Sequence, residues 1–127
     1  MVRIAVVDDD PVFADMMRDV FGVQGWDMIA FSRSRGILPA LAQTRPDVIV
    51  LDIWMEEEDS GWILLDQLRE DPRTAGIPVV ICSEAGSDVE GHMMRLRLHA
   101  VPFVDKPFDI EEMVQIVEAL LGSADTG

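Results

Sequence analysis

The sequence is poor in three features: cysteine, positive charge and long apolar runs. Cys82 is the only cysteine among 127 residues, which excludes an intrachain disulfide and a cysteine metal cluster. It lies in the apolar run 79–82, a setting typical of a buried and unreactive thiol. No apolar run is long enough to cross a bilayer, and the N-terminus does not resemble a signal peptide. We therefore expect a cytoplasmic location.

Lysine and arginine are scarce as well. The chain has 10 of them against 24 aspartates and glutamates, which gives a formal net charge of −14. Nucleic acids and anionic membrane surfaces are bound through clustered Lys and Arg. We therefore expect no direct nucleic acid binding and no membrane partner. Apolar residues, in contrast, make up 49% of the sequence, and a chain of this length and composition folds as one domain.

The apolar pattern alternates between strands and helices. Apolar segments predict strands at 2–7, 26–31, 48–51, 78–82 and 101–104. Helical spacing and breaking residues predict helices at 11–21, 37–42, 60–70, 87–98 and 109–121. The first helix has one wide apolar stripe, made of Val12, Phe13, Met16, Met17, Val20 and Phe21. This alternation predicts an α/β fold, a parallel sheet with helices on both faces.

The end of the last helix sets the expected domain boundary. Gly122 is predicted to stop that helix, because glycine commonly follows the last helical residue. Residues 1–122 are therefore expected to form the domain, and residues 123–127 a flexible C-terminal tail.

The chain is organised around the run 48–51, four branched apolar residues that end abruptly in Asp52. Such a run is typical of a strand buried on both faces, and open α/β sheets bind ligands at the carboxyl ends of such strands. Asp8-Asp9, Ser83 and Lys106-Pro107 follow other predicted strands in the same way. Asp10, which precedes Pro11, is interpreted as a helix N-cap.

This set of residues strongly resembles the receiver domain of two-component response regulators. The resemblance covers the chain from Val2 to about Leu121. It implies a doubly wound, flavodoxin-like sheet with the strand order 2-1-3-4-5. In that order the carboxyl ends of strands 1, 3, 4 and 5 converge on one shallow pocket.

The resemblance also implies a Mg²⁺ site and a phosphoryl acceptor. Asp52 would be the nucleophile that receives a phosphoryl group from a histidine kinase or a histidine phosphotransfer protein. Asp9 and Asp52 would bind Mg²⁺ directly, with the Trp54 backbone carbonyl as a third ligand. Asp8 would support the ion through a water molecule. The activity implied is Mg²⁺-dependent self-phosphorylation with slow self-dephosphorylation, and no enzymatic turnover.

Two further residues would act on the phosphoryl group itself. Lys106 would neutralise charge on its oxygens, and the Ser83 hydroxyl would donate a hydrogen bond to one of them. Ser83 and Phe103 match the positions that this family uses as a switch, although Phe103 equally suits a half-buried strand residue. Trp54 is expected to shield an acyl phosphate from water.

A partner surface is expected on the fourth predicted helix, the fifth strand and the fifth helix. The fourth helix carries a basic cluster within an acidic protein: His92, Arg95, Arg97 and His99. The resemblance implies that this face contacts a downstream protein, while core packing with ordinary solvated charge remains an alternative.

Glu56 departs from the family pattern, which usually has proline there, and the loop from Asp52 to Gly61 is one residue longer than usual. This departure leaves open a phosphorylation-independent, receiver-like interaction module. An Asp-nucleophile phosphatase is a third reading, but it would need a second acid where Trp54 stands.

Overall fold

A computed structural model describes residues 1–53, 60–84, 101–106 and 109–125, and the account below concerns those residues. Strands and helices alternate along them. Their bounds are β1 Arg3–Val7, α1 Pro11–Val23, β2 Asp27–Phe31, α2 Leu38–Thr44, β3 Val48–Asp52, α3 Ser60–Glu70, β4 Val79–Glu84, β5 Phe103–Lys106 and α5 Ile110–Asp125. The helix predicted at 87–98 lies outside the described residues.

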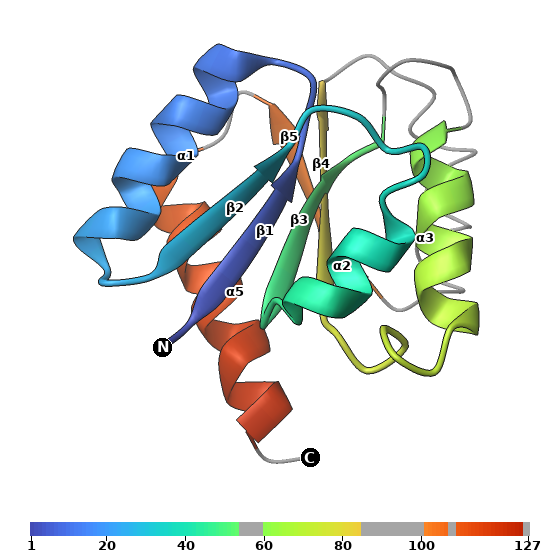
Figure 1. Ribbon diagram of the computed structural model, residues 1–127. Helices are drawn as coiled ribbons and strands as arrows, with labels where there is room; N and C mark the ends of the chain where they lie inside the picture. The colour runs from blue at the N-terminus through green and yellow to red at the C-terminus, as the bar shows by residue number, and fades with distance from the viewer. Residues whose placement is uncertain (54–59, 85–100, 107–108, 126–127) are drawn as a thin grey trace.

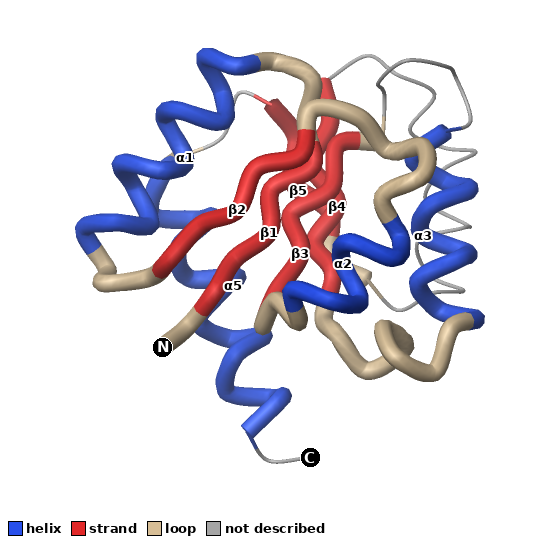
Figure 2. Tube along the Cα trace, in the orientation of Figure 1, coloured by secondary structure: helices blue, strands red, loops and turns tan. Residues whose placement is uncertain are grey.

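The strands form one parallel sheet in the order β2-β1-β3-β4-β5. The predicted fold class and strand order are therefore confirmed. Helices α1 and α5 cover one face of the sheet, and α2 and α3 cover the other (Figures 1 and 2). The carboxyl ends of the strands all lie at the same edge, toward the top of Figure 1.

Strand β3 is buried on both faces, as its uninterrupted apolar sequence predicts. Successive side chains of a strand point to opposite faces, so this strand contributes to two cores. Ile49 and Leu51 pack in the core that contains the α3 residues Leu64 and Leu65. The other core, beneath α1 and α5, is formed by Val48, Val50, Phe13, Met17, Phe21, Met113 and Val117, among others. Asp52 thus ends a strand that is held from both sides.

Helix α1 buries only the centre of its apolar stripe. Phe13, Met17 and Phe21, spaced four residues apart, are buried against the sheet. Val12 and Met16, in contrast, are 75% and 42% exposed. Only the centre of the apolar stripe is buried because a helix lying on a sheet contacts it along one line, and the flanking residues turn toward solvent.

Several elements end at different residues from those predicted. Strand β5 occupies Phe103–Lys106, and α5 continues through Gly122 to Asp125. Val101 is buried although it precedes the strand, whereas Asp105 pairs with Ser83 despite its polarity. An apolar side chain indicates that a residue is buried, but it does not indicate that its backbone pairs with a neighbouring strand. The strand predicted at 101–104 therefore began two residues before β5 does. Gly122 does not stop α5 as predicted, because glycine inside a helix costs only about 1 kcal/mol relative to alanine.

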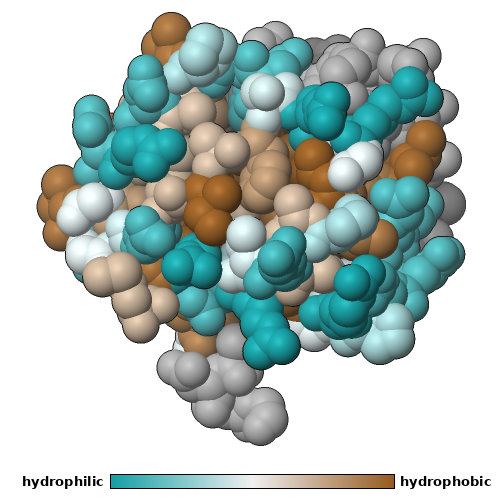
Figure 3. Space-filling model, in the orientation of Figure 1, coloured by the Kyte–Doolittle hydropathy of each residue, from teal (hydrophilic) through white to brown (hydrophobic). Residues whose placement is uncertain are grey.

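The surface agrees with the acidic composition. Hydrophilic side chains spread over much of the face seen in Figure 3, with apolar atoms between them. Outward-facing apolar side chains include Val12, Met16 and Val23 on α1 and Ile110 on α5. Among the residues that the structure describes, no helix has the length and apolarity needed to span a membrane.

Candidate metal centre

Three carboxylates meet at the carboxyl edge of the sheet. Asp8 and Asp9 follow β1, and Asp52 is the last residue of β3. Strands β1 and β3 are neighbours, with Val7 paired to Leu51, so the chain brings Asp8 and Asp52 side by side. One carboxylate oxygen from each of the three aspartates lies within 4.8 Å of the others. The sequence therefore identified residues that the fold brings together.

Asp8 is held in place by backbone hydrogen bonds. Its own N–H donates to the carbonyl oxygen of Phe31, at 2.9 Å. Its carboxylate Oδ1 accepts a hydrogen bond from the N–H of Asp10, also at 2.9 Å. The sequence analysis did not predict the hydrogen bond to Phe31. The implied strand order, which places the second strand beside the first, could have predicted it. These contacts fix the orientation of Asp8 before any ligand is bound.

Burial makes the cluster electrostatically costly. Asp8 is 4% exposed and Asp52 is 7% exposed, while Asp9 is exposed to solvent. Three carboxylates held this close repel one another, and a buried charge is costly unless it is paired. A cation placed among the three would offset both effects.

The donor set fits Mg²⁺. This ion prefers oxygen ligands in an octahedron at about 2.0–2.1 Å, so oxygens on opposite sides of it are about 4.2 Å apart. At most one pair of the three oxygens can be opposite, and adjacent ligands are about 2.9 Å apart, so oxygens within 4.8 Å of one another would draw closer to share one ion. The exposed Asp9 leaves one side of the cluster open to water, and Mg²⁺ usually keeps several waters.

A hollow of about 380 Å³ adjoins the carboxylates. Asp8 and Asp9 form one part of its wall, and α1 with the end of β2 forms the rest. Its other lining residues are Pro11, Ala14, Asp15, Arg18, Ala30, Phe31 and Ser32. The acid cluster therefore borders an open hollow on the α1 side, and Asp52 is not among the residues that line it.

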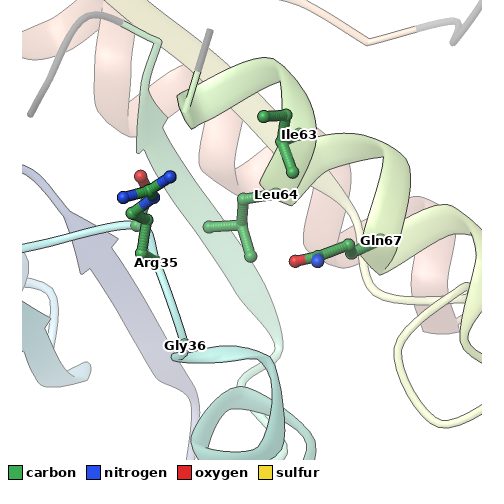
Figure 4. Close-up of a pocket in the computed structure, with 6 residues that line it drawn as sticks. Arg35, Gly36, Ile63, Leu64 and Gln67 are labelled. Carbon is green, nitrogen blue, oxygen red and sulfur yellow. The ribbon is translucent and has the colours of Figure 1, made fainter. Parts of the chain in front are cut away.

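A second hollow, of about 220 Å³, lies away from the cluster, between the β2–α2 connection and α3. Figure 4 shows Arg35 and Gln67 on two sides of it, with Ile63 and Leu64 on α3 between them. None of the predicted site residues lines this hollow.

Ser83 and Lys106 lie in strands whose ends reach the same edge of the sheet. Asp52 pairs with Cys82, so Ser83 is the next residue along β4. Lys106 is the last residue of β5 and pairs with Glu84. Both residues belong to their strands, whereas the sequence predicted that they would follow them.

Phe103 is the first residue of β5 and pairs with Ile81. It is partly buried and packs against the core on the α3 side of the sheet. This packing suits a half-buried strand residue, and its switching role stays a prediction. Trp54 and the basic cluster of the fourth predicted helix lie outside the described residues.

Comparisons with known proteins agree on one family. A protein-family model described as "Response regulator receiver domain" matches residues 4–118. The chain is 35% identical over 126 residues to the DNA-binding dual master transcriptional regulator RpaA of Synechocystis, covering 98% of this chain and 51% of that protein. It is 33% identical to the DNA-binding response regulator MtrA of Mycolicibacterium smegmatis, covering 94% of this chain and 50% of that protein.

The fold has close counterparts among solved structures. A response regulator receiver domain protein from Clostridium thermocellum superposes with a TM-score of 0.86, over 99% of this chain and 98% of that one. At 17% identity this likeness shows the fold alone.

These relatives correct the partner prediction. RpaA and MtrA are both named as DNA-binding, so the expectation of no nucleic acid partner is contradicted. The chain spans about half the length of the curated relatives that it matches. The net charge of this chain does not limit what the parts of those relatives that it does not cover can bind.

Proposed function

This chain belongs to the response regulator receiver domain family, and we propose that it is a Mg²⁺-dependent phosphoryl acceptor with Asp52 as its nucleophile. The observation that carries the proposal is the cluster of Asp8, Asp9 and Asp52 at the carboxyl ends of β1 and β3. The donor would be a histidine kinase or a histidine phosphotransfer protein. A domain at residues 1–122 followed by a tail at 123–127 is also a proposal. Helix α5 extends past that boundary, to Asp125.

The proposed reaction is a transfer of the phosphoryl group to a carboxylate. An oxygen of Asp52 attacks phosphorus, the bond from phosphorus to the donor nitrogen breaks, and an acyl phosphate forms on Asp52. Asp8 and Asp9 would hold the cation beside that oxygen. When bound, Mg²⁺ neutralises charge on the transferred oxygens.

Ser83 and Lys106 complete the proposed site. Transfer of a phosphoryl group depends mainly on positioning and on charge stabilisation. The ammonium group of Lys106 would stabilise the oxygens of the transferred group, and the hydroxyl of Ser83 would donate to one of them once the acyl phosphate has formed. The supporting observation is that β4 and β5 carry their backbones to the edge where Asp52 lies. The proposed activity is Mg²⁺-dependent self-phosphorylation with slow self-dephosphorylation.

Intact-mass measurement tests this function. The protein is incubated with acetyl phosphate, with Mg²⁺ or with a chelator, and wild type should gain about 80 Da, one phosphoryl group, only with Mg²⁺. Asp52→Asn should gain nothing, because an amide is a poor nucleophile.

Asp47→Asn is the matched control. Asp47 lies at the opposite end of β3 and accepts a hydrogen bond from the Arg3 N–H at 2.8 Å, so its substitution should leave uptake unchanged. Equal uptake by wild type and Asp52→Asn would place the acceptor elsewhere. No uptake by either would favour a phosphorylation-independent interaction module.

A further inference from the structure

Gly61, the second residue of α3, lies directly against the chain that leaves β3. A Cβ atom added to Gly61 would lie 2.6 Å from the Cα of Ile53, 2.6 Å from its carbonyl oxygen and 2.9 Å from its carbonyl carbon. Such distances are well inside van der Waals contact, and all three atoms belong to the backbone. Gly61 is the only glycine in the described ranges at which an added Cβ would meet an atom within 4 Å.

Neither side of this contact can move away easily. Ile53 is 1% exposed and packs in the core on the α3 side. It continues directly from β3, whose last residue, Asp52, is paired with Cys82. Helix α3 is anchored from the other side by buried apolar residues: Trp62, Leu64, Leu65 and Leu68. A side chain at position 61 would therefore strain the joint between two fixed elements.

The joint lies next to the proposed acceptor. Ile53 follows Asp52 in the chain, and the Asp52 carboxylate lies within 4.8 Å of those of Asp8 and Asp9. Figure 1 shows α3 running back along the sheet from the end at which β3 terminates. A displacement of the Ile53 backbone would therefore change the position of the Asp52 carboxylate relative to its two neighbours.

We infer that Gly61 is a positioning residue: its missing side chain lets α3 lie against Ile53, and this contact holds the Asp52 carboxylate beside those of Asp8 and Asp9. The inference rests on the proposed function, because the relative position of the three carboxylates matters only if they share a cation. Mg²⁺ demands near-ideal octahedral geometry, so a shift of about 0.5 Å in one ligand is enough to weaken the site.

The test compares Gly61→Ala with Gly22→Ala. Both glycines lie in helices, and a Cβ at Gly22 would meet no atom within 4 Å, so the control matches the change in helix propensity without the clash. Mg²⁺ affinity is measured by calorimetric titration well below the melting temperature. The initial rate of phosphoryl uptake from acetyl phosphate is measured at saturating Mg²⁺.

Gly61→Ala should bind Mg²⁺ at least about tenfold more weakly. Because its Asp52 is displaced, it should also take up phosphate more slowly at saturating Mg²⁺, while Gly22→Ala should match wild type. A purely structural role would lower the melting temperature of Gly61→Ala and leave the Mg²⁺ affinity of its folded form unchanged. That result overturns the inference while leaving the proposed function intact. If wild type itself binds no Mg²⁺, the inference and the proposed function both fail.

Poor folding of Gly61→Ala would not prevent the test. All three proteins would then be titrated in trimethylamine N-oxide, which strengthens effective burial and raises the folded population. A variant that remains unfolded there would also overturn the inference, since it would make Gly61 a requirement of the fold rather than of the site.

Discussion

At the scale of single residues, the three neighbouring aspartates 8, 9 and 10 have three different surroundings. Asp8 is buried and fixed by the backbone of Phe31 in β2 and of Asp10, the N-cap of α1. Asp9 is exposed and contributes an oxygen to the cluster with Asp52. The Asp10 side chain instead accepts a hydrogen bond from the Val12 N–H at 2.9 Å, which caps α1. Adjacent residues of the same type thus serve the site and the fold separately.

Mg²⁺ should stabilise the folded protein because it binds the folded carboxylate cluster. At ten times its dissociation constant the ion should add about 1.4 kcal/mol to the free energy of unfolding. For a chain of this length that corresponds to a rise of about 5 °C in melting temperature. Calorimetric melting at fixed ionic strength, with Na⁺ replacing Mg²⁺ in the control, measures the effect. A melting temperature that does not respond to millimolar Mg²⁺ would contradict the metal site.

Asp9→Asn should separate repulsion from metal binding. Removing one charge relieves repulsion with Asp8 and Asp52, so the ion-free variant should melt at a higher temperature than wild type. The same change removes a ligand, so the Mg²⁺-induced rise should largely disappear. The measurement is the pair of melting curves with and without Mg²⁺; a variant that keeps the full rise would remove Asp9 from the site.

At the scale of the element, Asp10 connects the site to α1. Replacing it with alanine leaves the Val12 N–H without its cap, which should cost about 1 kcal/mol, or about 4 °C in melting temperature. The Mg²⁺-induced rise should be unchanged, because Asp10 interacts with the helix and not with the cation. Asp10→Ser retains a capping oxygen and serves as the control. Loss of the Mg²⁺ response in Asp10→Ala would show instead that Asp10 supports the metal.

Strand centres could be predicted from the sequence, and so could the ends of β1 and β2 at Val7 and Phe31, but the bounds of the edge strand β5 could not. The run 48–51 predicts β3 because burial on both faces requires apolar side chains throughout. The edge strand β5 includes Asp105 and Lys106, whose pairing with β4 depends on backbone hydrogen bonds. Backbone pairing does not depend on side-chain polarity, so the sequence contains no clear signal for the end of this strand.

At the scale of the whole molecule, the order of the strands creates the candidate site. Asp8 and Asp52 are far apart in the sequence and become neighbours because β1 lies beside β3. Polar residues at strand ends can be read from the sequence, so the three carboxylates were predictable. The role of Gly61 was not, because its contact with Ile53 forms only when α3 packs against the chain that leaves β3.

Asp52 is predicted to carry the acyl phosphate, and chemical reduction can locate it. Borohydride reduces an aspartyl phosphate to homoserine, which lowers the mass of that residue by about 14 Da and marks its position. After incubation with acetyl phosphate and Mg²⁺, the protein is reduced and digested, and the peptide containing Asp52 is fragmented in a mass spectrometer. Fragmentation is essential because Asp47, Asp59 and Asp66 lie close by in the sequence. Homoserine at position 52, and its absence when Mg²⁺ is withheld, is the predicted result. Homoserine at another aspartate, or none in a protein that has gained the phosphoryl mass, would contradict the account.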